Sequence, residues 1–301
     1  MTRPAAAEPI HVWFALLRGS LALDWAGPAE ALRSANTWLA DQGEPERFVL
    51  HFTAPQPTLT SSVGLQLSGL EPLPASLPVP SWVVVVGMTG KRIDVADEDA
   101  LSLLHWLRGL RLVAGRLELL TVCAGAVLAA HAGLLAGRRA TTHQQHLDEL
   151  AAIEPRCDVV ANRVFVSDGA LYSSAGVATG IDLTRYRIAE TCGPAIAAHV
   201  AQTLVLAQRR GPEDPQFAPF LDHRNHLHAA LHRVQDAVAQ APQQEWSVSA
   251  MAAIACTSPR HLTRLFVEHA GIAPGSDTQL RRAWHQFGRV GTPFHLGRRS
   301  H

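Results

Sequence analysis

Cysteines are few in this sequence, and no two of them form a CxxC pair. Cys123, Cys157, Cys192 and Cys256 stand far apart in a chain of 301 residues, which is not a small scaffold that needs disulfide staples. We expect reduced thiols in a cytoplasmic protein. Neither a P-loop nor a GxGxxG motif occurs, and we expect no cofactor.

We also expect neither a targeting segment nor a membrane-spanning segment in the sequence as given. The apolar run before Arg18 is short and no cleavage pattern follows it, so we expect no signal peptide. Residues 119–137 are uncharged and nominally long enough to cross a membrane. However, this stretch contains glycines and His131 and begins like a strand, so we expect no membrane span.

Lysine is almost absent, because Lys91 is the single lysine beside 25 arginines. This bias is typical of genome composition and carries little functional weight. The formal net charge is zero, yet residues 226–301 hold eight Arg against four Asp or Glu, which leaves +4 there and −4 on the rest. A basic C-terminal segment indicates a polyanionic partner.

The remaining composition is that of a globular protein, with 47% hydrophobic and 17% charged residues. Short apolar runs alternate with helix-like stretches in the first two-thirds, which predicts βαβ units in a flavodoxin-like, doubly wound α/β sheet. We expect strands at residues 10–17, 47–54, 81–87 and 117–123, with helices at 26–40, 97–114, 177–190 and 193–208. Two or three more strands are expected over residues 158–176, with a tight turn at Asp168-Gly169.

A change of composition marks a domain boundary after residue 208. Residues 209–220 combine three prolines, a glycine and mixed charge, which is typical of a linker. The residues beyond it predict only helices. We therefore divide the chain into an α/β domain at residues 8–208, a linker at 209–222 and a small all-α domain at 223–301.

The stretch TVCAGA, residues 121–126, has the small neighbours that a strand-to-helix turn carrying a nucleophile requires. Cys123 stands at the turn, where the following helix N-terminus would stabilise a thiolate. It also ends a strand, which is where open α/β sheets bind ligands. The alternative is a packed core thiol, because free cysteine is among the most buried residue types.

Two other motifs accompany this turn: LDWAGPAEAL, which places Asp24 at the end of the first strand, and RRATTH, which ends at His143. Together with VSDGALYSSAGVATGIDL and RRGPEDPQF, they make residues 10–220 resemble the PfpI-like branch of the class I glutamine amidotransferase superfamily. Within it, the chain is similar to GlxA-type sensor domains fused to AraC-type DNA-binding domains. The resemblance implies a pocket formed by Asp24, Gly87, Cys123, Ala124 and His143.

Two departures from that family favour a sensor over an enzyme. Ala124 stands where a His or Thr serves the hydrolytic or hydratase members, and Gly87-Met88 replaces a frequent pair of glycines. In the fused regulators the resemblance implies that the pocket senses a small molecule. The alternative is a cysteine-dependent hydrolase or hydratase.

Residues 246–274 resemble the first helix-turn-helix of an AraC-type domain. Ser258 is placed to cap the second helix, Pro259 takes its first position, and Leu262, Leu265 and Phe266 form its buried side. In this motif the second helix enters the major groove of DNA. We expect base or phosphate contacts from Arg260, His261, Thr263 and Arg264.

An internal deletion follows Pro274. The next residues resemble the second recognition helix of such a domain, without the connecting helix and the supporting helix that normally precede it. We expect this deletion to weaken or abolish specific DNA binding and to leave the α/β domain intact. We expect DNA contacts there from Thr278, Gln279, Arg281 and Arg282. Leu280, Trp284 and Phe287 form an apolar stripe that must pack on the first motif, pair with another chain or stay loosely ordered.

The histidines of HRNHLHAALH, residues 223–232, could bind a metal, because His228 and His232 lie one turn apart. No cysteine or carboxylate completes a site, and Leu227 and Leu231 define a core helix, so we expect no metal. The sequence thus predicts a regulator that binds double-stranded DNA and an unknown small-molecule effector, and a homodimer is compatible with it. A third reading is a regulator that has lost DNA binding and interferes with intact relatives.

Overall fold

The computed structural model describes residues 8–206, 210–212, 214, 223, 226, 228–241 and 243–278. The chain divides into two compact units, Met1–Asp214 and Pro215–His301. Each unit has its own hydrophobic core and is described by itself below.

The first unit is built on a six-stranded sheet with the order β2-β1-β5-β6-β10-β9. Five strands run parallel, and β9 pairs antiparallel with β10 at one edge. The strands are β1 (Ile10–Ala15), β2 (Phe48–Thr53), β5 (Ser81–Val85), β6 (Leu117–Val122), β9 (Phe165–Asp168) and β10 (Leu171–Ser174). This order confirms the flavodoxin-like, doubly wound sheet.

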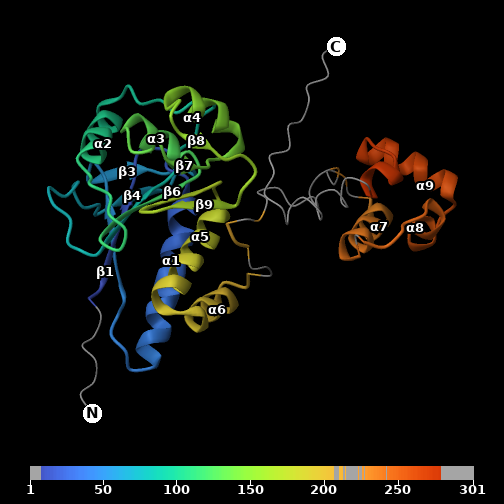
Figure 1. Cartoon of the computed structure of the whole chain (residues 1–301), viewed down its shortest axis with the longest axis horizontal. Coiled ribbons are helices and arrows are strands. Elements are labelled where there is room, and N and C mark those ends of the chain that lie inside the picture. The colour runs from blue at the N-terminus through green and yellow to red at the C-terminus, as the bar shows by residue number, and fades with distance from the viewer. Residues whose placement is uncertain are drawn as a thin grey trace. The chain divides into compact units, whose positions relative to one another are not determined.

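Helices cover both faces of this sheet (Figure 1). On one face α1 (Ala22–Asp41) packs with α5 (Thr179–Cys192) and α6 (Pro194–Thr203). On the other face lie α2 (Glu98–Arg108), α3 (Gly125–His131) and α4 (Leu147–Ile153). Neighbouring residues of β1, β5, β6 and β10 belong to one or the other of two buried apolar clusters, as in a sheet covered on both sides.

The first four predicted strands are confirmed to within two residues. The expected Asp168-Gly169 turn is also confirmed, since Asp168 pairs with Leu171 across a two-residue loop and Gly169 has a φ of 62°. The structure has three strands over residues 158–176, where two or three were expected: β8 (Asp158–Val159), β9 and β10. It adds short elements that sequence patterns miss, namely β3 (Thr58–Thr60), β4 (Gln66–Ser68), β7 (Arg139–Ala140) and the 3-10 helix η1 (Gln144–His146).

Three predicted helix limits are wrong, and one of them is the end of α6, which stops at Thr203 and not at residue 208. The helix expected at 26–40 begins at Ala22, because the Ala22 amide donates to Ser62 Oγ and the Leu21 amide donates to the Gly87 carbonyl. Asp24 therefore lies in the first turn of α1 and not in the preceding loop. The helix expected at 97–114 ends at Arg108, where Gly109 follows, and Asp97 caps its start by accepting from the Ala100 amide.

The second unit contains α7 (Ala229–Gln240), α8 (Val248–Ile254), α9 (Pro259–Leu265) and the π-helical turn η2 (Phe266–Ala270). Among the described residues of this unit, the buried core consists of Leu231, Val234, Val238, Met251, Ala252, Ala255, Leu262, Leu265, Phe266 and Ala270. The core helix expected from Leu227 and Leu231 is α7, on which Leu231 is buried together with Val234 and Val238; Leu227 lies outside the described residues.

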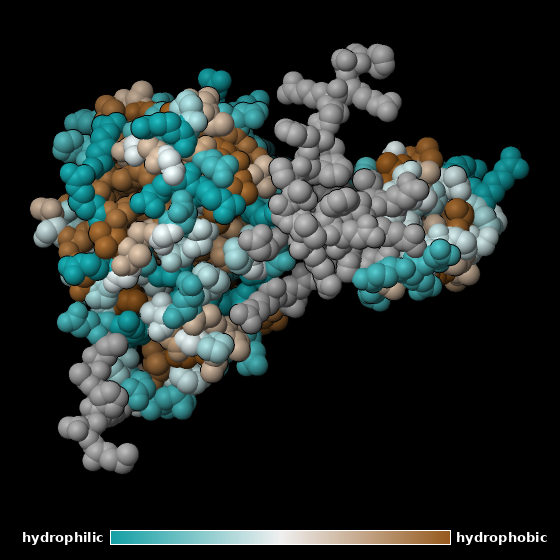
Figure 2. Space-filling view, in the orientation of Figure 1, coloured by the Kyte–Doolittle hydropathy of each residue, from teal (hydrophilic) through white to brown (hydrophobic). Residues whose placement is uncertain are grey.

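On the face of the first unit turned to the viewer, hydrophobic residues show between hydrophilic ones (Figure 2). Within the part of the chain that the structure describes, no helix combines the length and apolar character needed to cross a membrane.

Candidate functional site: a buried cysteine turn and an exposed helix

Cys123 stands in a sharp turn between β6 and α3, as the small residues around it predict. Its φ of 57° lies in the left-handed region, which is unusual for a residue with a side chain. Gly125 is required immediately after the turn, since a Cβ there would lie 2.0 Å from the Val85 carbonyl oxygen. The backbone of α3 thus passes directly against β5, and Cys123 is held where the two elements meet.

Asp24 approaches this turn from the first turn of α1 and is fully buried. Its Oδ2 accepts a hydrogen bond from the Gly87 amide at 3.1 Å, and its Oδ1 accepts one from the Val177 amide at 3.0 Å. Burial raises the pKa of the Asp24 carboxyl to about 6, although these two amides and the Cys123 thiol act in the opposite direction. Asp24 therefore ties α1 to the segments that follow β5 and β10.

Two glycines enclose the Cys123 side chain. A Cβ on Gly87 would lie 2.8 Å from Cys123 Cβ and 2.8 Å from Asp24 Oδ2. A Cβ on Gly176, whose φ is +103°, would lie 2.7 Å from Cys123 Sγ. The thiol is consequently almost closed off, with 4% of the residue exposed.

This environment favours a neutral thiol, whereas we expected a thiolate. We predicted that the helix N-terminus would stabilise a thiolate, but burial, followed by the Asp24 carboxylate, raises the pKa of Cys123 to about 12. At neutral pH the residue is a protonated thiol beside the Asp24 carboxyl. The sharp turn is confirmed, whereas an activated nucleophile is not supported.

The other two predicted pocket residues behave differently from one another. Ala124 is buried directly beyond Cys123 and offers only a methyl group. His143 is half-buried, caps η1 by accepting from the Gln145 amide, and lies with its ring 6.2 Å from that of His146. Burial, followed by His146, lowers the pKa of His143. None of the described contacts joins His143 to Cys123.

The residue that contacts Cys123 from this segment is Thr142, which the sequence analysis missed. Thr142 Oγ1 donates to the Cys123 carbonyl oxygen at 2.8 Å. Its position directly before His143 in the motif ATTH was the available indication.

Fully buried hydroxyl groups lie behind the turn. The Thr141 amide donates to Ser173 Oγ at 2.9 Å, and Ser173 pairs in register with Thr121 on the neighbouring strand. Among the described groups, Thr121 Oγ1 and Thr141 Oγ1 have no hydrogen-bond partner. Because buried polar atoms are normally satisfied, these two hydroxyls are suited to bind a water molecule or a polar ligand atom.

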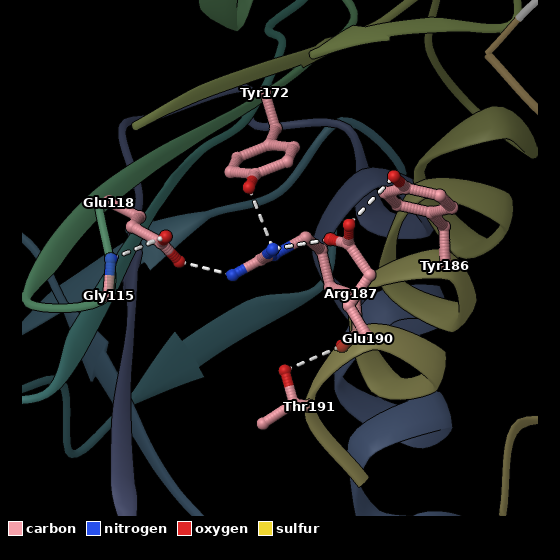
Figure 3. A network of polar contacts seen from close by, with 7 residues as sticks. All are labelled: Gly115, Glu118, Tyr172, Tyr186, Arg187, Glu190 and Thr191. Carbon is pink, nitrogen blue, oxygen red and sulfur yellow. Dashed lines mark hydrogen bonds and ion pairs between the residues drawn. The ribbon is translucent and has the colours of Figure 1, made fainter. Parts of the chain in front are cut away.

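A separate polar network surrounds Arg187 of α5 (Figure 3). Its guanidinium donates to Glu118 near the start of β6, to Tyr172 Oη on β10 at 2.7 Å and to Glu190 at 2.6 Å. It also lies over the rings of Tyr172 and Trp82. This network fastens α5 to the sheet near the start of β6, at the end of that strand away from Cys123.

In the second unit, α8 and α9 form the expected helix-turn-helix. Ser258 caps α9 by accepting from the His261 amide at 3.3 Å, and Ser247 caps α8 by accepting from the Ala250 amide at 3.1 Å. The predicted burial of Leu262, Leu265 and Phe266 is confirmed. The sequence placed the start of α9 correctly because Ser258 and the buried positions are close neighbours in the chain.

The opposite side of α9 carries the predicted DNA contacts. Arg260, Thr263 and Arg264 are exposed and His261 is half-exposed. Arg264 Nη2 donates to His261 Nδ1 at 2.9 Å, and Thr263 Oγ1 donates to the Pro259 carbonyl at 3.0 Å. The four side chains therefore belong to the surface of the second helix of the motif.

Thr278 does not belong to that surface. It is 5% exposed, and its Oγ1 donates to the Pro274 carbonyl at 3.0 Å and lies 3.7 Å from Met251 Sδ. The prediction that Thr278 contacts DNA is therefore wrong for this structure, because the residue packs on the core of the first motif. Gln279, Arg281, Arg282 and the apolar stripe at Leu280, Trp284 and Phe287 lie outside the described residues.

The histidines of the second unit contact each other and the backbone. His232 Nε2 lies 2.8 Å from the His226 carbonyl, and the ring of His228 lies 5.1 Å from that of His269. Across the described residues of both units, no group of three or more ligating side chains could hold a metal ion.

Comparisons with known proteins identify relatives of both units. A model of the DJ-1/PfpI family matches residues 83–190. The HTH-type transcriptional regulator GlxA of Rhizobium meliloti (strain 1021) is 31% identical over 263 residues, which cover 87% of this chain and 78% of that protein. The HTH-type transcriptional regulator CdhR of Pseudomonas aeruginosa is 32% identical over 207 residues, which cover 68% of this chain but only 57% of CdhR.

A solved structure shares the fold of part of the chain. The AraC family transcriptional regulator from Pseudomonas putida superposes with a TM-score of 0.54 and 21% identity, covering 65% of this chain and all of that chain. At this level of identity the likeness concerns the fold alone.

Proposed function

This chain belongs to the family of the HTH-type transcriptional regulator GlxA, and we propose that it is itself a cytoplasmic, DNA-binding transcriptional regulator that senses a small molecule. The observation that carries the proposal is the capped helix α9, which turns Arg260 and Arg264 to solvent while Leu262 and Leu265 are buried. We place the sensor domain at residues 8–208, the linker at 209–222 and the DNA-binding domain at 223–301.

The DNA-binding part of the proposal follows from the chemistry of α9. The second helix of such a motif enters the major groove, where a guanidinium can bind guanine O6 and N7 or a phosphate. Arg260 and Arg264 lie one turn apart, so both reach the same stretch of groove. His261 and Thr263 add smaller polar contacts beside them.

The sensing part rests on the polar groups gathered at the carboxyl ends of β5, β6 and β10, which is where open α/β sheets bind ligands. We propose that Asp24, Gly87, Cys123, Ala124 and His143 line the effector pocket, as the resemblance implies. The unpartnered hydroxyls of Thr121 and Thr141 support a ligand with polar atoms. Because the Cys123 thiol is protonated at neutral pH, we assign it to binding and not to nucleophilic attack.

The deletion after Pro274 leaves one complete helix-turn-helix motif in each chain. A single motif makes few contacts and binds weakly. We therefore propose that two copies bind DNA together as a homodimer, because linking two weak sites raises affinity through effective concentration.

The test is binding of the full chain to its own upstream DNA across a salt series, in the presence of competitor DNA. Each arginine that binds a base contributes about 1–3 kcal/mol, so Arg260→Ala/Arg264→Ala is expected to weaken competitor-resistant binding by at least about tenfold. Arg111→Ala/Arg116→Ala removes the same charge from exposed positions of the first unit and should change affinity less than about twofold.

The proposal is wrong if both double variants weaken binding equally, or if wild-type binding is indifferent to sequence at every salt concentration. Binding of that kind is driven by counterion release alone.

A further inference from the structure

The chain that leaves the first unit is fastened back onto that unit. Arg210 Nη2 donates to Asp182 Oδ2 of α5 at 2.5 Å, and Arg185 Nη2 of the same helix donates to the Arg210 carbonyl at 3.2 Å. The side chains of Asp182 and Arg185 are both 6% exposed and that of Arg210 is 32% exposed, so the α5 side of these contacts is withdrawn from water. A buried, charge-assisted contact of this kind is stronger than a surface ion pair.

A second fastening lies four residues further on. The Asp214 carboxylate accepts from the Gly211 amide at 2.6 Å, which closes a turn. The Asp214 carbonyl accepts from the Val164 amide at 2.9 Å, immediately before β9. We call the four residues Asp182, Arg185, Arg210 and Asp214 the clasp.

The clasp is connected to the Cys123 turn by a short backbone route. The Val164 amide donates to Asp214, and the Val164 carbonyl accepts from the Ala175 amide at 3.0 Å. Ala175 precedes Gly176, whose Cα lies against the Cys123 side chain so closely that a Cβ would approach Cys123 Cβ to 2.5 Å. A shift of Gly176 therefore reaches Asp214 through Ala175 and Val164.

The second route runs through the start of α5. Val177 donates to Asp24, and Thr179 Oγ1 accepts from the Gly176 amide at 2.7 Å just where α5 begins. Asp182 lies in the first turn of the same helix. Gly176 and Val177, which contact Cys123 and Asp24, are thus joined to Asp182 by a short continuous stretch of chain.

The residues around the first turn of α5 are packed closely, so this turn has little room to deform locally. A Cβ on Gly180 would lie 2.8 Å from Val122 Cγ1, and a Cβ on Gly27 of α1 would lie 2.7 Å from Ile181 Cγ1. Closely packed elements move as units and do not deform continuously.

We propose that the clasp responds to the effector and transmits its binding. A small molecule that displaces Gly176 and Val177 from Cys123 and Asp24 changes the contacts that Arg210 and Asp214 make with the first unit. The inference rests on the proposed function and deepens it by naming how the pocket regulates DNA binding. Release of the clasp frees chain between the two units. The length of that free chain sets the effective concentration of one DNA-binding motif near another.

The proposal is tested by its reciprocity, because a coupling between two sites acts equally in both directions. In the full chain without DNA or effector, Arg210→Gln should loosen the clasp and thereby uncover Cys123. The readout is the rate of Cys123 alkylation by iodoacetamide, located by peptide mass spectrometry. Cys256, which is exposed and lies in the second unit, is the internal reference.

We expect Arg210→Gln to raise the Cys123 rate relative to Cys256 by about fivefold or more, the lower end of typical coupling between sites. Asp182→Asn should act in the same direction, and combining the two should add little. Arg156→Gln is the matched control, since Arg156 forms an ion pair with Glu154 away from α5. It should leave the ratio unchanged.

Hydrogen exchange at the Gly211 and Val164 amides, both of which donate to Asp214, reports directly on the clasp. Faster exchange there in Arg210→Gln, with an unchanged Cys123 ratio, would show a local tether and overturn the proposal. An unchanged ratio with unchanged exchange would overturn it as well. Neither readout involves DNA, so failure here leaves the DNA-binding test to decide the proposed function separately.

Discussion

Arginines in the two units are used in opposite ways. Arg187 in the first unit is 8% exposed and surrounded by Glu118, Tyr172 and Glu190, with its guanidinium over two aromatic rings. Arg260 and Arg264 in the second unit are exposed on α9 above a buried apolar side. One residue type thus holds a helix to a sheet in one unit and provides a surface for a polyanion in the other.

This difference shows that the role of an arginine in this chain depends on whether its side chain is buried or exposed, which the number of arginines in the sequence does not indicate. A buried guanidinium whose partner is removed leaves an uncompensated charge, so its loss is measured as stability. An exposed guanidinium costs little stability when removed, so its loss is measured as affinity. The predictions below test whether the two units can be separated in this way.

The largest effect is expected at the Arg187 network. Glu118→Gln removes the buried carboxylate that faces the guanidinium and should lower the free energy of unfolding by about 3 kcal/mol. Urea unfolding followed by circular dichroism measures this loss. Affinity of the folded protein for DNA should stay within about twofold of wild type.

Glu30→Gln is the matched control, because Glu30 pairs with Arg33 on the exposed side of α1 at 2.7 Å. An exposed pair contributes about 0–1 kcal/mol, so this variant should unfold almost as wild type does. Equal losses of unfolding free energy in Glu118→Gln and Glu30→Gln would contradict the expected difference between a buried and an exposed ion pair.

The next effect concerns pH and the buried Asp24. Its folded pKa of about 6 lies above the usual value of 3.8, so the folded state binds the proton more tightly than the unfolded state. Stability from this group is complete below about pH 4 and is lost as pH rises through 6. A shift of this size corresponds to roughly 2–3 kcal/mol between the two limits.

The measurement is the urea midpoint at pH 4.5 and at pH 7 for wild type and for Asp24→Asn. The asparagine cannot titrate, so the pH-dependent loss seen in wild type should shrink in the variant, whatever its absolute stability. An identical pH dependence in the two proteins would show that Asp24 does not titrate in this range. The exposed α9 offers no comparable buried carboxyl, so DNA-contact variants should keep the wild-type profile.

Much of the fold could be predicted because the deciding interactions are local. The buried strands are short apolar runs, and the turn at Cys123 is surrounded by small residues that leave room for close backbone approach. Ser258 and Leu262 define α9 within a few residues of each other. In each case the sequence window contains both partners.

The features that were missed depend on partners that are distant in the sequence. The early start of α1 is fixed by Ser62 and Gly87, and the inward position of Thr278 by Met251. The Arg187 network joins residues from β6, β10 and α5. The protonated state of Cys123 follows from burial by Gly176, more than fifty residues away, which no local pattern around the turn could indicate.

The smallest effects are expected from two Thr→Val substitutions, one on the inward and one on the outward side of the second unit. Thr278→Val removes a hydroxyl that donates to the Pro274 carbonyl inside the core, and a lost hydrogen bond of this kind costs about 1 kcal/mol of stability. Thr263→Val removes a hydroxyl from the exposed side of α9, where stability should change by less than about 0.5 kcal/mol. We expect DNA affinity to respond in the reverse order, falling in Thr263→Val and unchanged in Thr278→Val. Thermal unfolding and DNA titration of both variants measure the four values. If Thr278→Val instead weakened DNA binding without loss of stability, Thr278 would face the DNA and the division between an inward and an outward side of this unit would fail.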